Sequence, residues 1–198
     1  VKLHTVGKPL PGVELRLAEE GEILLRGDGI FHGYFANPQA TAETLEDGWL
    51  RTGDVGSVTS DGYLTVSDRS RDVIRSGGEW IYSAMLENLI MDAPEVVECA
   101  VIGYPDDKWG ERPLAVTVLH EDIAQTTQTA EELREGLRAS LPSWMLPEYW
   151  TFVRDIDKTS VGKFDKKDLR KHLANGDFTV IALKGPGQPK EIRTDQMI

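Results

Sequence analysis

Cysteine is almost absent from this sequence, which contains one cysteine in 198 residues. Cys99 lies in the apolar run VVECAVIGY, and we therefore predict that it is a small buried residue. One cysteine and four scattered histidines make neither a disulfide framework nor a zinc site. We expect no metal-binding site residues in this chain.

Positive charge and long apolar runs are also scarce. The 22 basic residues are outnumbered by 33 acidic ones, and the net charge of -11 argues against broad nucleic-acid binding, although it is compatible with a local basic site. No apolar run approaches a membrane span and no signal-peptide pattern is present, so we expect a cytoplasmic protein without a transmembrane segment. The sequence starts with Val1 and enters a turn and a strand at once, so we expect a fragment of a longer chain.

The first third of the sequence has the pattern of short strands and turns. Apolar and polar residues alternate in VELRL and in GEILLRG, which favours strands. The segment VGSVTSDGYLTVSDR is typical of a hairpin that turns at Asp61-Gly62, where glycine can take the positive φ of a tight turn. NPQATAETLEDGW predicts a short helix with Asn37 as its N-cap and Pro38 at its first position.

A charged connection follows this β-rich unit, which we assign to residues 1–68. The segment SDRSRDVIRSGGEW has four ionic residues between positions 68 and 72 and lacks apolar periodicity. Such a segment is typical of an exposed link between two units, and we predict a hinge at residues 69–72.

After the hinge the pattern changes to helices and strands. Helices are expected at 83–94, 129–141 and 166–173, and strands at 96–105, 113–120 and 150–153. Ser83 should cap the first of these helices, and a capping box of Thr129 and Glu132 the second. Residues 73–173 are therefore predicted to form a compact α+β domain, with helices packed against a small sheet. Residues 174–198 form a tail, in which FTVIAL could be a strand and the rest is expected to be loose.

Three motifs occur along the sequence in the following order: GWLRTGDVG, DRSRDVIRSGGEWI and TSVGKFDKK. Together they resemble the C-terminal part of the adenylate-forming superfamily, which includes acyl-CoA synthetases, firefly luciferase and the adenylation domains of peptide synthetases. SGGEWIYSAMLEN and PDDKWGERPLAV resemble the medium- and long-chain fatty-acyl-CoA ligases of that superfamily. The resemblance covers roughly residues 5 to 173.

The resemblance implies a two-step ligase. Such enzymes join a carboxylate to ATP, giving acyl-AMP and pyrophosphate; a mobile lid then rotates, and the thiol of coenzyme A (CoA) attacks the acyl-AMP. The chain would supply the last β-rich subdomain of a large N-terminal domain, the hinge, and the whole α+β lid. The ATP phosphate loop, the Mg²⁺ ligand and the acyl pocket would belong to the missing domain, so the chain alone is expected to be inactive.

The resemblance implies that two residues bind the nucleotide, one in the β-rich unit and one at the start of the hinge. Asp54 matches an aspartate whose two carboxylate oxygens accept hydrogen bonds from the ribose hydroxyls. Arg69 matches an arginine whose parallel donors reach the nucleotide. From the residues alone, Asp54 is a turn aspartate beside Gly53, and Arg69 is a surface arginine paired with a neighbouring aspartate. Arg71 falls at the hinge itself.

Gly77 and Gly78 open a predicted hairpin in SGGEW. Turn geometry alone explains them, whereas the resemblance implies that they line the CoA channel, where a side chain would block the pantetheine arm. Trp80 stands where acetyl-CoA-type relatives carry an arginine that binds phosphate, and we interpret it as a structural aromatic residue.

Lys163 is the predicted catalytic residue. Its Gly-Lys pair is not a P-loop, because Asp157 and Phe164 stand where a glycine and a Ser or Thr are needed. A solvated loop lysine is the simplest interpretation of the residues. The resemblance implies that its ammonium bridges the acyl carboxylate and the α-phosphate during adenylation. Lys166, Lys167 and Arg170 could contact CoA phosphates, but a solvated basic helix is the better interpretation.

Two alternatives to a fatty-acyl-CoA ligase stay open. An acyl-AMP ligase could load a carrier protein instead of CoA. If the chain were complete as given, it could be a non-catalytic docking or binding module. All of these readings involve small-molecule or protein partners and none involves nucleic acid.

Overall fold

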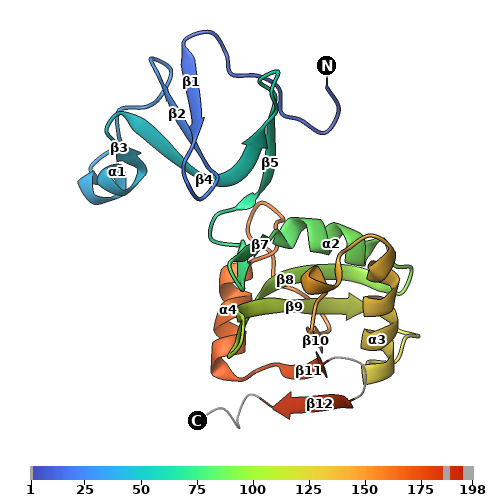
Figure 1. The fold of residues 1–198 in the computed structure, drawn as a ribbon. Coiled ribbons are helices and arrows are strands. Elements are labelled where there is room, and N and C mark those ends of the chain that lie inside the picture. The colour runs from blue at the N-terminus through green and yellow to red at the C-terminus, as the bar shows by residue number, and fades with distance from the viewer. Residues whose placement is uncertain (1, 185–187, 194–198) are drawn as a thin grey trace. The chain divides into compact units, whose positions relative to one another are not determined.

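The computed structural model describes residues 2–184 and 188–193. It divides into two compact units, of which the first ends at Arg71 and the second begins at Asp72. The division therefore falls within the segment 69–72. Each unit is described by itself (Figure 1). In the described part of the chain, no helix is long and apolar enough to cross a membrane.

The first unit is a small antiparallel sheet with one short helix. The strands follow the order β1-β2-β4-β3, and β5 pairs with the other part of β4. The elements are β1 (Val13–Leu17), β2 (Glu22–Gly27), α1 (Pro38–Thr44), β3 (Leu45–Glu46), β4 (Trp49–Val58) and β5 (Leu64–Arg69). Its buried hydrophobic residues are Ile23, Leu24, Trp49 and Val55.

Local sequence signals of the first unit are confirmed. The Asn37 side chain caps α1 by accepting a hydrogen bond from the N–H of Ala40 at 3.0 Å, and Pro38 is the first helical residue. Strands β4 and β5 form the predicted hairpin. Gly62 lies in its turn with φ of 84°, a left-handed conformation that favours glycine.

The second unit contains a mixed sheet flanked by helices. Its strand order is β12-β11-β10-β9-β6-β7, with β8 paired along β9; the β9–β10 pair is parallel and the other pairs are antiparallel. The strands are β6 (Ile74–Ser76), β7 (Glu79–Ile81), β8 (Val96–Asp106), β9 (Gly110–Leu119), β10 (Tyr149–Phe152), β11 (Thr179–Lys184) and β12 (Gln188–Arg193). The helices are α2 (Ser83–Met91), α3 (Thr127–Gly136) and α4 (Lys166–Asn175), with short 3-10 helices η1 (Leu137–Ala139) and η2 (Ser143–Met145).

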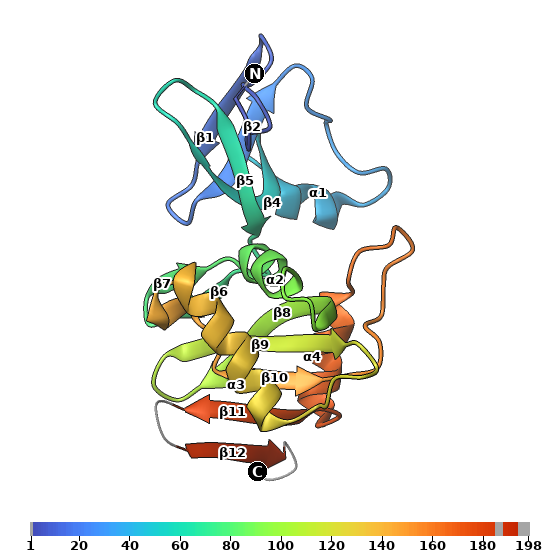
Figure 2. The same cartoon turned by 90° about the vertical axis from the view of Figure 1, so that its right-hand side faces the viewer.

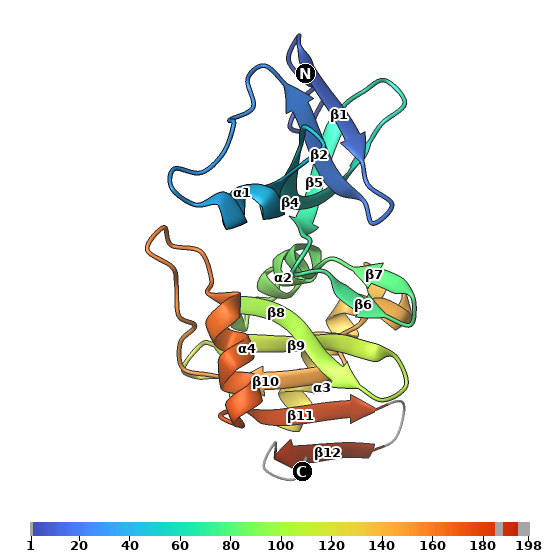
Figure 3. The same cartoon turned by 90° about the vertical axis from the view of Figure 1, so that its left-hand side faces the viewer.

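A hydrophobic core lies on each face of this sheet. Strand β8 alternates between them, with Cys99 and Val101 in one core and Ala100 and Ile102 in the other. The first core is covered by α2 and α3 (Figure 2) and the second by α4 (Figure 3). The predicted α+β class and the burial of Cys99 are both confirmed.

Several predicted boundaries of the second unit are wrong. Helix α3 begins at Thr127 with Thr126 as its cap, because the Thr129 hydroxyl donates to the carbonyl of Ala124 at 2.6 Å instead of capping the helix. Ser83 is the first residue of α2 rather than its cap, and no side chain caps this helix.

The predicted tail, residues 174–198, includes segments that belong to the folded domain. Helix α4 continues to Asn175, and β11 pairs with β10 and contributes buried residues, among them Val180 and Ala182, to the core under α4. The boundary at residue 173 thus removes a strand that the sheet needs. Residues 185–187 and 194–198 of the predicted tail lie outside the described residues.

Candidate functional site

Asp54 and Arg69 lie opposite each other on β4 and β5. They are register partners, and Nε of Arg69 is 2.9 Å from Oδ1 of Asp54. Arg69 therefore pairs with the other predicted nucleotide residue, while Asp68, which the sequence suggested as its partner, accepts a hydrogen bond from the Arg69 backbone N–H. Both side chains remain partly exposed. The structure brings these two predicted residues together.

The β2–β4 pairing shifts register between Glu22 and Leu24, and side-chain hydrogen bonds at this break hold the backbone around Asp54. Glu22, buried at the edge of this break, accepts from the N–H of Gly53 at 3.0 Å and pairs with Arg51 at 2.7 Å. The Thr52 hydroxyl donates to the carbonyl of Ile23 and accepts from the N–H of Asp54 at 3.1 Å. These hydrogen bonds therefore fix the backbone position from which the Asp54 side chain extends.

Gly77 and Gly78 form the two-residue turn between β6 and β7, as predicted. Their φ values are 60° and 88°, which is the left-handed conformation that tight hairpin turns favour. A Cβ at Gly77 would lie 2.6 Å from a ring carbon of Trp109, whereas a Cβ at Gly78 would meet nothing within 4 Å. Gly77 is thus required by packing, and Gly78 borders open space.

A cavity of about 160 Å³ lies beside this turn. It is lined by Ser76, Gly77, Glu79, Trp109, Arg112, Trp144 and Glu148. A larger groove of about 400 Å³ runs between the end of α2 and α3, but none of the predicted site residues lines it. The smaller cavity is therefore the one relevant to the predicted site.

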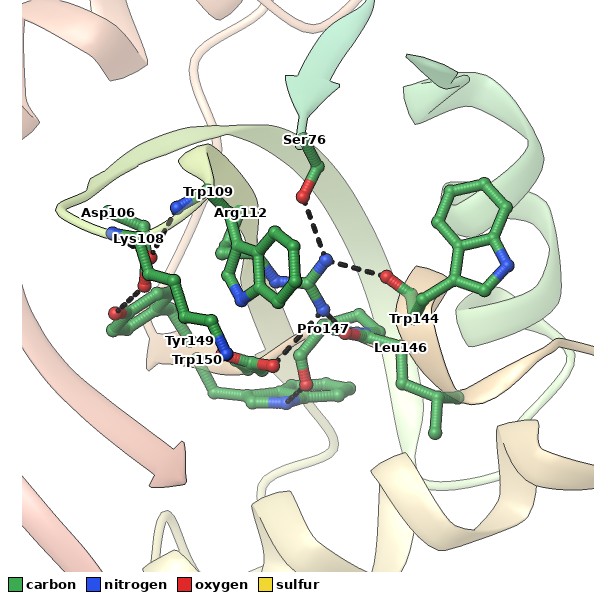
Figure 4. Close-up of polar contacts among 11 residues, drawn as sticks. Ser76, Asp106, Lys108, Trp109, Arg112, Trp144, Leu146, Pro147, Tyr149 and Trp150 are labelled. Carbon is green, nitrogen blue, oxygen red and sulfur yellow. Dashed lines mark hydrogen bonds and ion pairs between the residues drawn. The ribbon is translucent and has the colours of Figure 1, made fainter. Parts of the chain in front are cut away.

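Arg112 organises the cavity, and sequence reasoning did not find its role. Its guanidinium donates to the Ser76 hydroxyl at 2.9 Å and to the carbonyls of Trp144 at 2.6 Å and Leu146 at 3.2 Å, and it pairs with Glu148 at 3.2 Å (Figure 4). The residue is 3% exposed. One buried arginine thus joins the end of β6 to the segment before β10.

The loop that carries Trp109 is held by Asp106. One carboxylate oxygen of Asp106 accepts the N–H groups of Lys108 and Trp109, both at 3.0 Å, and the other accepts the Tyr149 hydroxyl at 2.9 Å (Figure 4). Burial, followed by this hydrogen bond to a carboxylate, raises the pKa of Tyr149, so it stays a donor. The Trp109 carbonyl in turn accepts the N–H of Gly77 at 2.8 Å.

Lys163 lies in a tight loop just before α4. Lys158 and Phe164 form a β-bridge at the base of the loop, and Thr159 and Lys163 are joined by a backbone hydrogen bond of 2.7 Å. Gly162 has φ of 78°. The Lys163 side chain is exposed, and none of the acidic groups that the structure describes pairs with it. The loop thus presents an exposed ammonium group at its surface.

The basic start of α4 is less solvated than predicted. Nζ of Lys166 lies 2.6 Å from Oε1 of Glu87, and Arg170 lies 2.6 Å from Asp72. Lys167 is exposed. The interpretation as a solvated helix therefore holds for Lys167 and is wrong for Lys166, which points inward because α2 supplies a partner.

Arg71 is exposed and is the last residue of the first unit. Asp72 follows it and is 8% exposed, so the predicted exposed link ends one residue earlier than expected. The ion pair with Arg170 explains why a carboxylate is buried here.

One group of side chains in the described part of the chain has the spacing of metal ligands. Ligand atoms of Asp157, Asp168 and His172 lie within 4.8 Å of one another. His172 also approaches Asp177 at 2.7 Å and Asp168 at 3.1 Å, and these carboxylates, Asp177 first, raise the pKa of its imidazole. The contacts of His172 with Asp168 and Asp177 account for the close spacing of this group.

The predicted residues of the second unit lie far apart within it. The turn between β6 and β7 carries Gly77 and Gly78, and the loop before α4 carries Lys163. Figures 2 and 3 place this turn and this loop at opposite sides of the unit. The two predicted functional segments of the second unit therefore lie on different sides of it.

Comparisons with known proteins give a matching domain family and similar enzymes. Residues 85–163 match the AMP-binding enzyme C-terminal domain. The chain is 43% identical over 183 residues to a long-chain-fatty-acid–CoA ligase of Thermus thermophilus, covering 85% of this chain and 33% of the ligase. It thus spans about a third of the length of that relative.

Two solved structures share the fold. An o-succinylbenzoate CoA synthetase from Bacillus subtilis, in complex with its acyl-adenylate intermediate, superimposes with a TM-score of 0.75 at 32% identity, covering 85% of this chain and 36% of the synthetase. An amide bond synthetase from Marinactinospora thermotolerans gives a TM-score of 0.71 at 35% identity, with the same coverage of 85% and 36%.

Proposed function

We propose that this chain, which belongs through residues 85–163 to the adenylate-forming superfamily, is the C-terminal part of an ATP-dependent fatty-acid–CoA ligase. The complete enzyme would convert a fatty acid and ATP to acyl-AMP and pyrophosphate, and then transfer the acyl group to the thiol of CoA with release of AMP. The Thermus ligase supports a fatty acid as the acid substrate. The second unit would be the mobile lid.

The observation that carries the proposal is the position of the two functional segments on the second unit. The Lys163 loop and the Gly77-Gly78 turn lie on opposite sides of it (Figures 2 and 3). A lid that turns about its attachment can offer first one side and then the other to a fixed active site. Two chemical steps with different needs, a cation first and open space second, fit this arrangement.

Lys163 suits the adenylating step. The carboxylate and the α-phosphate are both anions, so their approach is opposed by repulsion, and negative charge grows on the phosphate oxygens in the transition state. Lys163 is exposed and pairs with none of the acidic groups in the described part of the chain, so it can lie between the two anions and stabilise that charge. Its place on a loop lets it leave with the lid when the acyl-AMP has formed.

Asp54 and Arg69 suit the nucleotide. A carboxylate can accept from two neighbouring hydroxyls, as on ribose, and the Arg69 contact at 2.9 Å orients the Asp54 carboxylate. Arg71, exposed at the boundary of the two units, is the proposed hinge residue, where backbone torsions change and the side chain stays in water.

Gly78 suits the thiol-transfer step. It borders open space, and the 160 Å³ cavity next to the turn has two tryptophans among its lining residues. A pantetheine arm could pass close to the backbone here, because no side chain projects from Gly78. We place the ATP phosphate site, the Mg²⁺ ligands and the acyl pocket in the domain that precedes this chain.

Substrate assays on the full-length enzyme test the proposal. Acid-dependent exchange of pyrophosphate into ATP should be supported by fatty acids and weakly or not at all by aromatic acids, and free CoA should release the acyl group from acyl-AMP. Exchange with aromatic acids alone would keep the class and overturn the fatty acid. Acyl transfer to a phosphopantetheinyl carrier protein, with free CoA inert, would favour the carrier-loading alternative. The acceptor needs this test because one similar structure is named an amide bond synthetase and not a CoA ligase.

A further inference from the structure

Helix α4 begins three residues after Lys163, so its first turn fixes one end of the Lys163 loop. Asp165 caps the helix by accepting the N–H groups of Lys167 and Asp168, both at 3.1 Å. Lys166, the first helical residue, extends to α2. Its Nζ donates to Oε1 of Glu87 at 2.6 Å and to the Ser83 hydroxyl at 2.7 Å.

This contact between α4 and α2 is largely buried. The side chains of Lys166 and Glu87 are 12% and 11% exposed. Oε1 of Glu87 also accepts the N–H of Val101 on β8 at 2.8 Å. The ammonium is therefore held by two acceptors on α2, one of which is itself fixed to the sheet.

Stability alone is a weak explanation for a buried ion pair. Removing two charges from water costs several kcal/mol per ion, and apolar residues of similar volume are often equally stable or more stable. In some proteins a buried pair also fixes the relative position of two elements, because a large shift would separate the two charges. The Lys166–Glu87 pair thus has the properties of a positional constraint.

A second ion pair also holds α4 to the rest of the second unit. Arg170 follows Lys166 by one helical turn and pairs with Asp72, the first residue of the second unit, at 2.6 Å. Lys167, between them, is exposed. One face of α4 is therefore anchored by charge at two successive turns, and the anchor nearer the Lys163 loop is Lys166.

We propose that Lys166 is a positioning residue for adenylation: its contacts with Glu87 and Ser83 hold the start of α4, and hence the Lys163 loop, in one place relative to α2. The inference rests on the proposed role of Lys163. Lys166 acts through Lys163 and does not touch the substrates. Misplacing a catalytic group by about 1 Å can cost on the order of 100-fold in rate, so a loosened loop should be visible in the adenylation step.

The test uses three variants of the full-length enzyme. Lys166→Met leaves the buried carboxylate of Glu87 without its cationic partner. Lys166→Met combined with Glu87→Gln removes that charge and keeps an acceptor for the Val101 N–H. Lys167→Met removes an exposed lysine one residue away and is the matched control. Melting temperature, acid-dependent pyrophosphate exchange, and thioester formation from supplied acyl-AMP and CoA are measured for each.

We expect Lys166→Met to lower the melting temperature and to slow pyrophosphate exchange by about 10- to 100-fold, while thioester formation from acyl-AMP is retained. The double variant should regain the melting temperature but not the exchange rate, and Lys167→Met should match the wild type in all three measurements. If the double variant regains both stability and exchange, Lys166 is structural only and the inference is overturned.

The Lys163→Ala variant separates this inference from the proposed function. Loss of exchange in Lys163→Ala, with normal exchange in the double variant at Lys166 and Glu87, would reject the positioning role alone. Normal exchange in Lys163→Ala would reject the proposed function of Lys163 itself.

Discussion

At the scale of single residues, the two glycines of the β6–β7 turn serve different ends. Both have positive φ, so either substitution places a side chain in the left-handed region. Gly77 has in addition no room, because a Cβ would lie 2.6 Å from the Trp109 ring. At Gly78 there is room for a side chain, so a substitution there should disturb packing less than one at Gly77. It would still obstruct a ligand that passes close to the backbone.

The first prediction compares Gly77→Ala with Gly78→Ala. Gly78→Ala should lower the free energy of unfolding by about 1–2 kcal/mol, the cost of a left-handed alanine. Gly77→Ala should cost about 1–3 kcal/mol more, because Trp109 must move. Urea denaturation of this chain measures both changes. Equal losses would show that Trp109 adjusts freely and that packing does not require Gly77.

The second prediction concerns the pH dependence of stability at His172. Hydrogen bonding to Asp177, followed by the charges of Asp168 and Asp177, raises the pKa of His172 above 6.5 in the folded chain. Protonated His172 therefore stabilises the fold fully below the unfolded pKa, and this contribution is lost as pH rises from about 6.5 through the raised pKa.

Melting temperatures of the wild type and His172→Gln across that pH range test this. The wild type should lose more stability than the variant as pH rises. Parallel curves would mean that water screens these exposed ion pairs completely.

At the scale of elements, the cavity wall depends on one residue with distant partners. Arg112 on β9 bonds to the end of β6, to η2 and to the segment before β10, and its partners Ser76 and Trp144 are 36 and 32 residues away in the sequence. Such contacts cannot be predicted from a local pattern. Asn37 and Gly62, whose roles depend on adjacent residues, were predicted correctly.

The same distinction explains the errors in α2 and the tail, whereas the error in α3 has a local cause. Thr129 has the spacing of a capping box, but its hydroxyl bonds to Ala124 upstream and the cap passes to Thr126. Ser83 was predicted to cap α2, but its hydroxyl instead accepts a hydrogen bond from Nζ of Lys166, which lies on α4, 83 residues later. Strand β11 was uncertain in the sequence because its burial depends on pairing with β10.

The third prediction tests Arg112 as the structural centre of the cavity. Arg112→Met should lower the free energy of unfolding by about 3–5 kcal/mol, because it leaves Glu148 without its buried partner and two carbonyls without a donor. Arg154→Met, a change at an exposed arginine, is the matched control and should be nearly neutral. Urea denaturation of the two variants gives the comparison, and a neutral Arg112→Met would contradict the assigned role.

At the scale of the whole molecule, the chain consists of two units joined between Arg71 and Asp72. The family motifs could be recognised in the sequence, and with them the α+β class and the likeness to a ligase lid. The acid substrate could not be recognised, because relatives that share this part of the chain act on different acids.

The fourth prediction places the flexible link. Trypsin cleaves after Arg and Lys, and Arg69 and Arg71 are exposed at the boundary, whereas Asp72 is held by Arg170. Limited trypsin digestion of this chain should cut first after Arg69 or Arg71 and release two resistant products. First cleavage at another site, with residues 69–72 protected, would argue against a hinge there.

The central claim is that one lid serves two steps with two opposite sides. Lys163→Ala in the full-length enzyme should slow acyl-AMP formation by about 10²–10³-fold, because one preorganised charge at a developing anion is lost. Gly78→Leu, which is expected to lower stability because Gly78 has positive φ and is therefore assayed at a temperature where melting curves show it folded, should spare that step and slow thioester formation, because its side chain enters the proposed path of the pantetheine arm. Lys167→Ala is the control for both.

The most direct test is the pair of half-reaction rates measured on these two variants: acid-dependent pyrophosphate exchange, and thioester formation from supplied acyl-AMP and CoA. The account predicts a crossed result, in which Lys163→Ala loses the first and keeps the second, and Gly78→Leu keeps the first and loses the second. Equal losses of both half-reactions in either variant would contradict it.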